Sequence, residues 1–172
     1  MKVKKVKLPE DCAAAKYLPI DFTEVLGTEV TAAKQLKPDD LQIGFWTDMP
    51  AWIRFMFKLR NILVKPFGLE RGEGDTNKFV EAIRNGTNNG MMSVADKTDR
   101  ETVLSLNDKH LKAYLSVYVE PIEQSNQQKV IVITLVKFHK RLGRVYFYTI
   151  YPFHCIIVKQ QVKRIVKKMI KS

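Results

Sequence analysis

Residues 129–170 have the sequence KVIVITLVKFHKRLGRVYFYTIYPFHCIIVKQQVKRIVKKMI, and this stretch decides the fold. Its first part, KVIVITLVKFH, predicts a long strand that is apolar on both faces from Val130 to Val136 and is therefore covered on each side. RVYFYTIYPF predicts a second long antiparallel strand, with Gly143 taking a positive φ in the intervening KRLG turn. From His154 to Ile170 the apolar residues recur at spacings of three and four, which predicts an amphipathic terminal helix.

The N-terminal half predicts one strand and one helix. Residues 21–36 are rich in threonine and valine, which favours a strand. A helix follows, capped by Thr47 or Asp48 and ended by Pro66 and Gly68. Its apolar stripe consists of Met49, Trp52, Met56, Leu59 and Leu63.

The middle of the chain predicts further strands. From Gly90 onward the apolar residues alternate, which predicts a hairpin of residues 91–95 and 101–106 and a strand at residues 111–119. The order of one strand, one helix, about five antiparallel strands and a long helix is typical of an α+β fold. We expect a curved antiparallel sheet wrapped around the C-terminal helix, with a space for a small molecule between them.

The net charge of +11 comes from the ends of the chain. Ten of the 29 lysine and arginine residues lie in residues 1–7 and 159–172, which contain no acid, and the body between them has 19 basic and 18 acidic side chains. A nucleic-acid-binding groove is therefore not indicated. We expect a single domain, residues 1–172, with a basic extension at residues 1–16.

Export, membrane insertion and metal binding are not indicated either. No stretch approaches the roughly 18 apolar residues of a spanning helix, and the first lysines precede no apolar signal segment. Cys12 and Cys155 form no CxxC pair, and the three histidines have no partner at ligand spacing. We therefore expect a cytoplasmic protein with no metal and no other cofactor.

Three separated motifs resemble one family. The chain contains WTDMPAWIRFMFKLRNILVKPFGL, LNDKHLKAYLSVYV and GRVYFYTIYPFH in the order of the bacterial family known as domain of unknown function 2867, and the resemblance covers residues 18–170. That family is similar to the START-like (SRPBCC) helix-grip superfamily, which implies a curved sheet gripping the C-terminal helix around a cavity. Related domains in some proteins follow a nucleotide-binding domain. Because Gly72-Glu73-Gly74 lies in a polar loop, no nicotinamide cofactor is implied.

Asp108 and His110 are candidate catalytic residues, because a carboxylate that orients an imidazole can make it a general base. They would move a proton in a cyclase- or isomerase-like reaction. We favour the alternative of a structural turn, in which Asp108 caps backbone amides and His110 packs at the rim of the sheet.

Other residues are candidates for ligand contacts. Arg60 either anchors a ligand carboxylate or, as we favour, pairs with an acid such as Glu101. The many aromatic side chains either fill a core or line a cavity in which tyrosine hydroxyls orient an apolar ligand. The expected ligand-binding residues are Trp52, Arg60, Glu101, His110, Tyr114, Tyr118, Tyr148 and His154.

The sequence thus predicts a non-enzymatic helix-grip protein that binds a hydrophobic small molecule. The alternatives are an enzyme that uses Asp108 and His110, and a peripheral binder of anionic membranes or RNA through the basic termini. For the lysine-rich final helix we favour a solvated face, whose charges interact with the helix dipole. No specific nucleic-acid partner is expected, because no RNA- or DNA-binding motif occurs.

Overall fold

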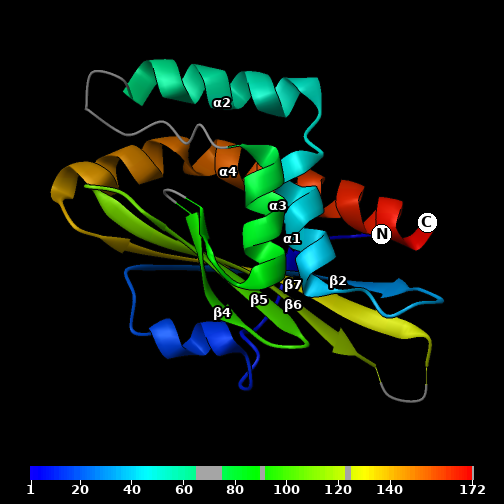
Figure 1. Cartoon of the computed structure of the whole chain (residues 1–172). Helices are drawn as coiled ribbons and strands as arrows, with labels where there is room; N and C mark the ends of the chain where they lie inside the picture. The colour runs from blue at the N-terminus through cyan, green and yellow to red at the C-terminus, as the bar shows by residue number, and fades with distance from the viewer. Residues whose placement is uncertain (65–74, 90–91, 123–124, 172) are drawn as a thin grey trace.

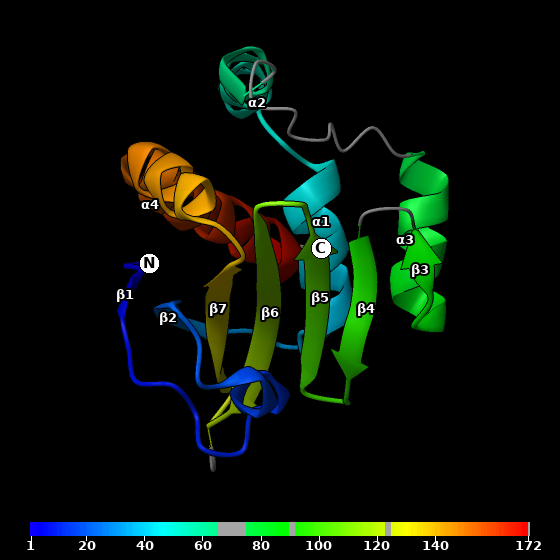
Figure 2. The ribbon, with the colours of Figure 1, turned by 90° about the vertical axis from the view of Figure 1, so that its left-hand side faces the viewer.

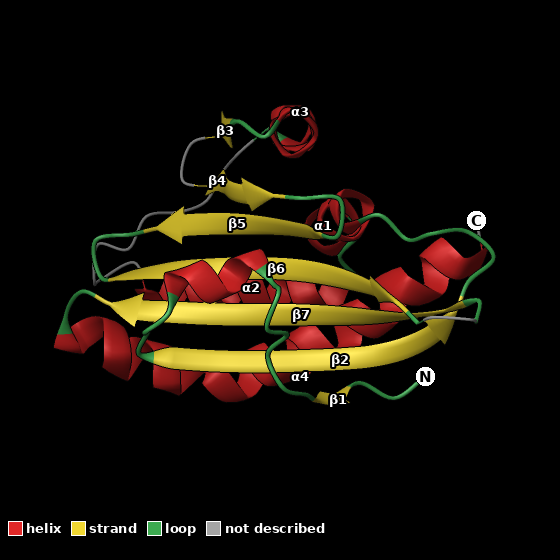
Figure 3. Cartoon of the chain, turned by 90° about the horizontal axis from the view of Figure 1, so that it is seen from below, coloured by secondary structure: helices red, strands yellow, loops and turns green. Residues whose placement is uncertain are grey.

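The computed structural model describes residues 1–64, 75–89, 92–122 and 125–171. The strands are β1 (Lys4–Lys5), β2 (Phe22–Thr31), β3 (Asn88–Asn89), β4 (Met92–Lys97), β5 (Glu101–Asn107), β6 (Leu111–Pro121) and β7 (Gln127–Phe138). The helices are the 3-10 helix η1 (Ala13–Tyr17), α1 (Pro38–Thr47), α2 (Ala51–Val64), α3 (Thr76–Asn85) and α4 (Arg141–Lys171). Within the described residues, the seven strands form one antiparallel sheet in the order β1-β2-β7-β6-β5-β4-β3 (Figure 3).

Helices cover one face of this sheet, and the N-terminal segment covers the other (Figure 1, Figure 2). α4 and α1 pack against the central strands in an apolar cluster that includes Val132, Val158 and Ile165. η1 packs on the opposite face, where Ala14 is buried against the sheet. The sheet curves around the long C-terminal helix, which confirms the predicted α+β helix-grip arrangement.

β7 is covered on both faces, as its apolar sequence predicts. It lies between β2 and β6 in the sheet. Val130 and Val132 belong to the cluster under α4, whereas Ile131 and Ile133 belong to the cluster under η1. This alternation follows from the period of two in a strand.

The prediction of a second long strand at residues 144–153 is wrong, because these residues form the first part of α4. A strand paired with β7 would need a free edge, and β2 and β6 occupy both edges of β7. The same residues also have a helical period. Phe147 and Tyr151, four residues apart, pack against Leu111 and Val136 of the sheet.

Gly143 is also placed differently from the prediction, since it lies within α4 and not in a turn of positive φ. Among the described glycines, Gly86 has a positive φ, of 68°, at the end of α3. A Cβ atom at Gly143 would lie 2.3 Å from the carbonyl oxygen of His110. Glycine therefore allows the first turn of α4 to pack directly on the turn between β5 and β6.

The helices within residues 38–64 differ in part from the prediction. The helix expected near residues 49–63 is confirmed as α2, but its stripe is not buried, since Trp52 and Leu59 are exposed while Ile53 is buried. α1 is absent from the prediction. Asp48, expected to cap α2, instead follows α1, and its backbone N–H donates to Gly44.

β2 is shorter than the strand that the sequence predicts. The expected bounds are residues 21–36, and in the structure the strand comprises Phe22–Thr31. The predicted helix end at Pro66 and Gly68, and the Gly72-Glu73-Gly74 segment, lie outside the described residues. Over the described part of the chain, no helix combines the length and the apolar character needed to cross a bilayer.

Candidate functional site

Among the described residues, three hollows lie beside α4, two of them on the side that faces α2 and one, of about 320 Å³, on the side that faces α1 and α3. No residue of the sheet lines any of the three, unlike the predicted space between α4 and the sheet. Side chains of both layers fill the space between α4 and the sheet, where Phe147, Val158 and Val162 are buried in apolar clusters. The two hollows that face α2 are lined jointly by residues of α4 and by residues within 50–59, in and just before α2. We call these two hollows together the α2–α4 groove.

The apolar end of the groove is a cavity of about 180 Å³. Its walls are formed by Met56, Phe57, Leu59, Thr149, Ile150, Phe153, His154 and Ile157. An apolar cavity of about 150 Å³ is large enough to bind benzene. This end of the groove therefore has room for a small ring or a short alkyl chain.

His154 connects this cavity to a buried carboxylate. Glu24 lies on β2 and is almost fully buried, and its Oε2 is 3.4 Å from His154 Nε2. Tyr151 Oη donates to Glu24 Oε1 at 3.2 Å, and Cys155 Sγ donates to the same oxygen at 3.4 Å. Glu24 Oε2 and His154 Nε2 are both buried, and neither forms a hydrogen bond of good geometry with a described residue. Three side chains within five residues of α4 thus converge on one carboxylate.

The surroundings of Glu24 keep it ionised. Burial raises the pKa of its carboxyl group, but contacts with His154, Cys155 and Tyr151 outweigh burial and bring this pKa below its ordinary value. Burial raises the pKa of the Cys155 thiol, so it remains a protonated donor and not a nucleophilic thiolate. The hydrogen bond with Cys155, followed by burial and the charge of Glu24, raises the pKa of Tyr151. The cluster is a fixed negative charge that orients the His154 ring.

The orientation of His154 leaves one ring nitrogen for a ligand. When Nε2 faces the Glu24 carboxylate, Nε2 carries a proton and Nδ1 of the neutral ring is an acceptor. No described residue forms a hydrogen bond with Nδ1. The apolar cavity therefore has one oriented polar group in its wall.

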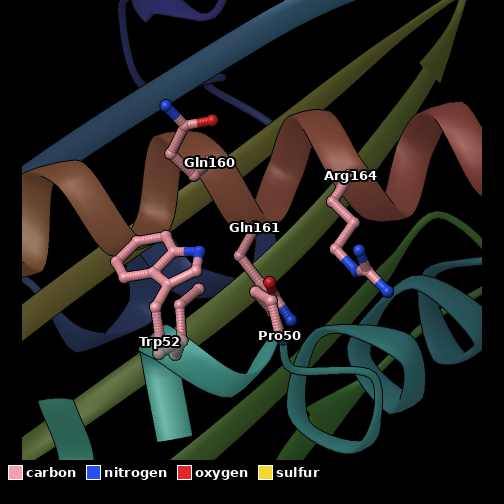
Figure 4. A pocket seen from close by; sticks show the side chains of 6 residues that line it. Pro50, Trp52, Gln160, Gln161 and Arg164 are labelled. Atoms are coloured by element: carbon pink, nitrogen blue, oxygen red, sulfur yellow. The ribbon is translucent and has the colours of Figure 1, made fainter. Parts of the chain in front are cut away.

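The other end of the groove is larger and more polar (Figure 4). This hollow of about 410 Å³ is lined by Pro50, Trp52, Ile53, Gln160, Gln161 and Arg164. Gln161 Nε2 donates to the carbonyl oxygens of Phe45 and Asp48, both at 2.8 Å, which fixes the side chain. Its Oε1 is buried and has no hydrogen-bond partner among the described residues. This acceptor is thus an unsatisfied polar group beside the hollow.

Trp52 and His154 are the predicted binding residues that line the groove, one at each end. Tyr148 lies elsewhere on α4, half-exposed, with its ring in an edge contact with Phe22. Arg60 belongs to α2, but its side chain lies outside the described residues.

Glu101 lies on the opposite face of the sheet. Its buried carboxylate accepts hydrogen bonds from the backbone N–H groups of Ala13 and Ala14, at the start of η1, and from the Ser116 hydroxyl. These bonds attach the N-terminal segment to the sheet. Glu101 is therefore separated from the groove by the sheet itself.

Tyr114 and Tyr118 share that opposite face. The ring of Tyr114 stacks on Tyr17, with 4.0 Å between the centroids. The Tyr118 hydroxyl donates to the carboxylate of Asp11 at 3.0 Å, and burial together with this contact raises the pKa of Tyr118 to about 12. Both tyrosines hold the N-terminal segment in place.

Asp108 and His110 lie in the turn between β5 and β6. The backbone N–H of Asp108 donates to Leu111, and the His110 carbonyl accepts from the backbone of His139. Both side chains are buried, yet Asp108 Oδ1 and His110 Nδ1 have no hydrogen-bond partner within the described residues. No hydrogen bond joins the two side chains there, and Asp108 caps no described backbone amide.

The sequence reasoning overlooked Glu24, although a signal was present. On the helix-facing side of β2, an acid occurs between Phe22 and Leu26, where the alternation calls for an apolar residue. Such a residue must find partners inside the protein. The partners could not be found locally, because His154 is 130 residues away along the chain.

Comparisons with known proteins identify the family of the chain. No curated protein and no solved structure matches the chain. The family model described as protein of unknown function (DUF2867) matches residues 18–161, which is most of the chain. The chain therefore belongs to the DUF2867 family.

Proposed function

We propose that this protein binds a hydrophobic small molecule in the α2–α4 groove. The apolar part of the ligand occupies the cavity of about 180 Å³, and a hydroxyl or similar donor on the ligand meets His154. The observation that carries this proposal is the contact between His154 and buried Glu24 at the wall of an otherwise apolar cavity, with 3.4 Å between Nε2 and Oε2. Binding sites combine this kind of apolar lining with a few oriented polar groups.

The polar end of the groove supports a ligand with a second polar group. The unpaired Oε1 of Gln161 offers an acceptor there, and Trp52 offers an apolar surface beside it. An elongated molecule that follows the groove would place its apolar part near Ile157 and its polar part near Gln161. The proposed ligand class is therefore a small amphipathic compound.

We also propose that the protein is cytoplasmic and belongs to the START-like superfamily. Cys12 and Cys155 are both free, which is in keeping with the reducing cytoplasm. A curved sheet around a long C-terminal helix is the arrangement of START-like domains, and bacterial origin goes with that family resemblance. We infer membership of that superfamily from this arrangement.

Two probes of nearly the same shape test the proposal. 4-Propylphenol and propylbenzene differ by one hydroxyl group, and isothermal titration calorimetry measures the affinity of each. For ligands of about ten non-hydrogen atoms we expect a Kd on the order of 0.1–1 mM. Because the hydroxyl can donate to His154, 4-propylphenol is expected to bind about fivefold more tightly.

Matched variants locate the binding site. Ile157→Trp fills the cavity and is expected to weaken binding of 4-propylphenol more than tenfold, whereas Val145→Trp, on an exposed turn of the same helix, leaves it unchanged. His154→Phe removes the preference for the phenol, and Glu24→Gln/His154→Phe repeats the test without a buried unpaired charge. Equal affinity of both probes, or equal loss in both tryptophan variants, would refute the proposal.

A second candidate function rests on the turn between β5 and β6. Asp108 and His110 each contain a buried polar atom without a partner among the described residues, and such groups are rare unless they serve a purpose. We propose as an alternative that they transfer a proton on a bound substrate. If so, His110→Ala abolishes turnover of a cyclase or isomerase substrate without changing the affinity for 4-propylphenol. Unchanged turnover would exclude this alternative.

A further inference from the structure

The outer surface of α2 and α4 exposes several large apolar side chains. Phe55 on α2 is 64% exposed, and Val145 on α4 is 65% exposed. Ile156 and Phe153 of α4 and Trp52 of α2 are also exposed. Figure 1 and Figure 2 show α2 as the element farthest from the sheet, with α4 beneath it, so both helices lie at one end of the molecule.

The apolar residues of α4 form one stripe that continues into lysines. Leu142, Val145, Thr149, Phe153, Ile156, Gln160, Lys163 and Lys167 recur at spacings of three and four, which places them on one side of a helix. The buried residues of α4, such as Val158 and Ile165, lie on the other side. The stripe is thus apolar in its first half and basic in its second half.

Within the described residues, α2 and α4 contain lysine and arginine but no aspartate or glutamate. The sequence contains no aspartate or glutamate from Gln124 to the C-terminus, nor from Met49 to Leu69. Lys163 and Lys167 have no carboxylate partner within the described part of the chain. By contrast, Arg164 and Lys168, on the side of α4 that faces α1, both bind Asp48.

The chemistry of this surface selects one partner. Aromatic and aliphatic side chains flanked by lysine and arginine are typical of helices that lie in the interface of a bilayer containing anionic lipids. A second copy of the chain would bring like charges together. RNA would pair with the lysines but would leave the aliphatic stripe of Val145 and Ile156 in water.

We propose that the outer surface of α2 and α4 binds membranes that contain anionic lipids. The helices lie on the membrane, with the apolar stripe in the interface and Lys163 and Lys167 near the lipid phosphates. This proposal does not depend on the small-molecule site, because the side chains that carry it do not line the groove: Phe55, Val145, Ile156, Lys163 and Lys167. It also differs from a role of the basic termini alone, because the aromatic residues of α2 are required.

Vesicle sedimentation tests the proposal with the full chain. We expect binding to vesicles of phosphatidylcholine with phosphatidylglycerol and none to phosphatidylcholine alone, and we expect the binding to weaken steeply as salt rises. Lys163→Gln/Lys167→Gln removes two charges and is expected to lower the partition coefficient about 30-fold. Phe55→Ser/Val145→Ser keeps the charge and is expected to lower it at least tenfold.

A matched control removes the same charge from the other face of the sheet. Lys112 and Lys137 pair across β6 and β7 and point away from the helices, so Lys112→Gln/Lys137→Gln is expected to retain nearly full binding. Trp52 supplies a second readout, since Trp46→Phe leaves it as the sole tryptophan of the chain, and its emission should shift to the blue on anionic vesicles.

Four results would overturn the proposal. They are equal binding to both kinds of vesicle, an equal loss in the two lysine variants, no loss in Phe55→Ser/Val145→Ser, and self-association or RNA binding in place of vesicle binding.

Discussion

Replacing the buried carboxylate of Glu24 by an amide of the same shape is the most informative perturbation of stability. Glu24→Gln removes the charge that faces Tyr151 at 3.2 Å, Cys155 at 3.4 Å and His154 at 3.4 Å. A hydrogen bond to a charged group contributes about 1.5–3 kcal/mol, and all three distances are long for such bonds. The burial of the carboxylate offsets part of the gain. We therefore expect a loss of about 2 kcal/mol, or about 4–8 °C in Tm.

The loss is expected to depend on pH. The pKa of Glu24 in the folded protein lies below its ordinary value, so its contribution is complete above the unfolded pKa of about 4.3. As the pH falls through the folded pKa, the carboxylate takes up a proton and the difference between wild type and variant disappears. Urea unfolding at pH 7 and at a series of acidic pH values measures this difference.

The control is Glu29→Gln, an exposed acid on the same strand, which is expected to change the free energy of unfolding by less than about 0.5 kcal/mol. If Glu24→Gln were as stable as the wild type at pH 7, or equally destabilised at every pH, Glu24 would not be the ionised centre of the cluster.

Three further predictions concern the framework around the groove. Gly143→Ala is expected to lower the free energy of unfolding by about 2–3 kcal/mol, because the added Cβ would lie 2.3 Å from the His110 carbonyl oxygen. Gly86→Ala, where there is open space but a positive φ, is expected to lower it by about 1 kcal/mol. Equal losses of the two variants in urea unfolding would contradict this prediction. Lys168 and Arg164 lower the pKa of Asp48, so Asp48→Asn is expected to lower the free energy of unfolding by about 0.5–1 kcal/mol above pH 5. This loss should be smaller in 1 M salt, and a loss that does not change with salt would argue against an ion pair. Burial and Asp11 raise the pKa of Tyr118 to about 12, whereas the unfolded chain ionises this tyrosine near pH 10. The wild type is therefore expected to lose stability relative to Tyr118→Phe as the pH rises from about 10 to 12. Parallel stability curves of the two proteins over this range would contradict the prediction.

The sheet and its central strand could be predicted because their signals are local. The two apolar faces of β7 follow directly from the residues Val130 to Val136, and the period of two in β5 and β6 identifies both strands. The start of α4 could not be identified in this way. Residues 144–153 satisfy both an alternating and a helical pattern, and the choice depends on whether β7 has a free edge, which is a property of the whole sheet.

The candidate site was predictable only in part for the same reason. Trp52 and His154 were identified from their residue types, but neither the location of the groove nor the role of Glu24 follows from local sequence. Glu24 and His154 meet because β2 and α4 pack against each other. Glu101 and Tyr118, in turn, are used by the N-terminal segment, whose packing across the sheet gives no periodic signal.

The central claim is that the cavity between α2 and α4 holds the apolar part of a ligand beside His154. Nuclear Overhauser contacts between bound 4-propylphenol and the protein test it most directly. We predict contacts from the propyl chain to the methyl groups of Ile150 and Ile157, and from the aromatic ring to His154. Contacts to Val103 or Tyr114 on the opposite face of the sheet, or saturable binding without contacts to either isoleucine, would contradict it.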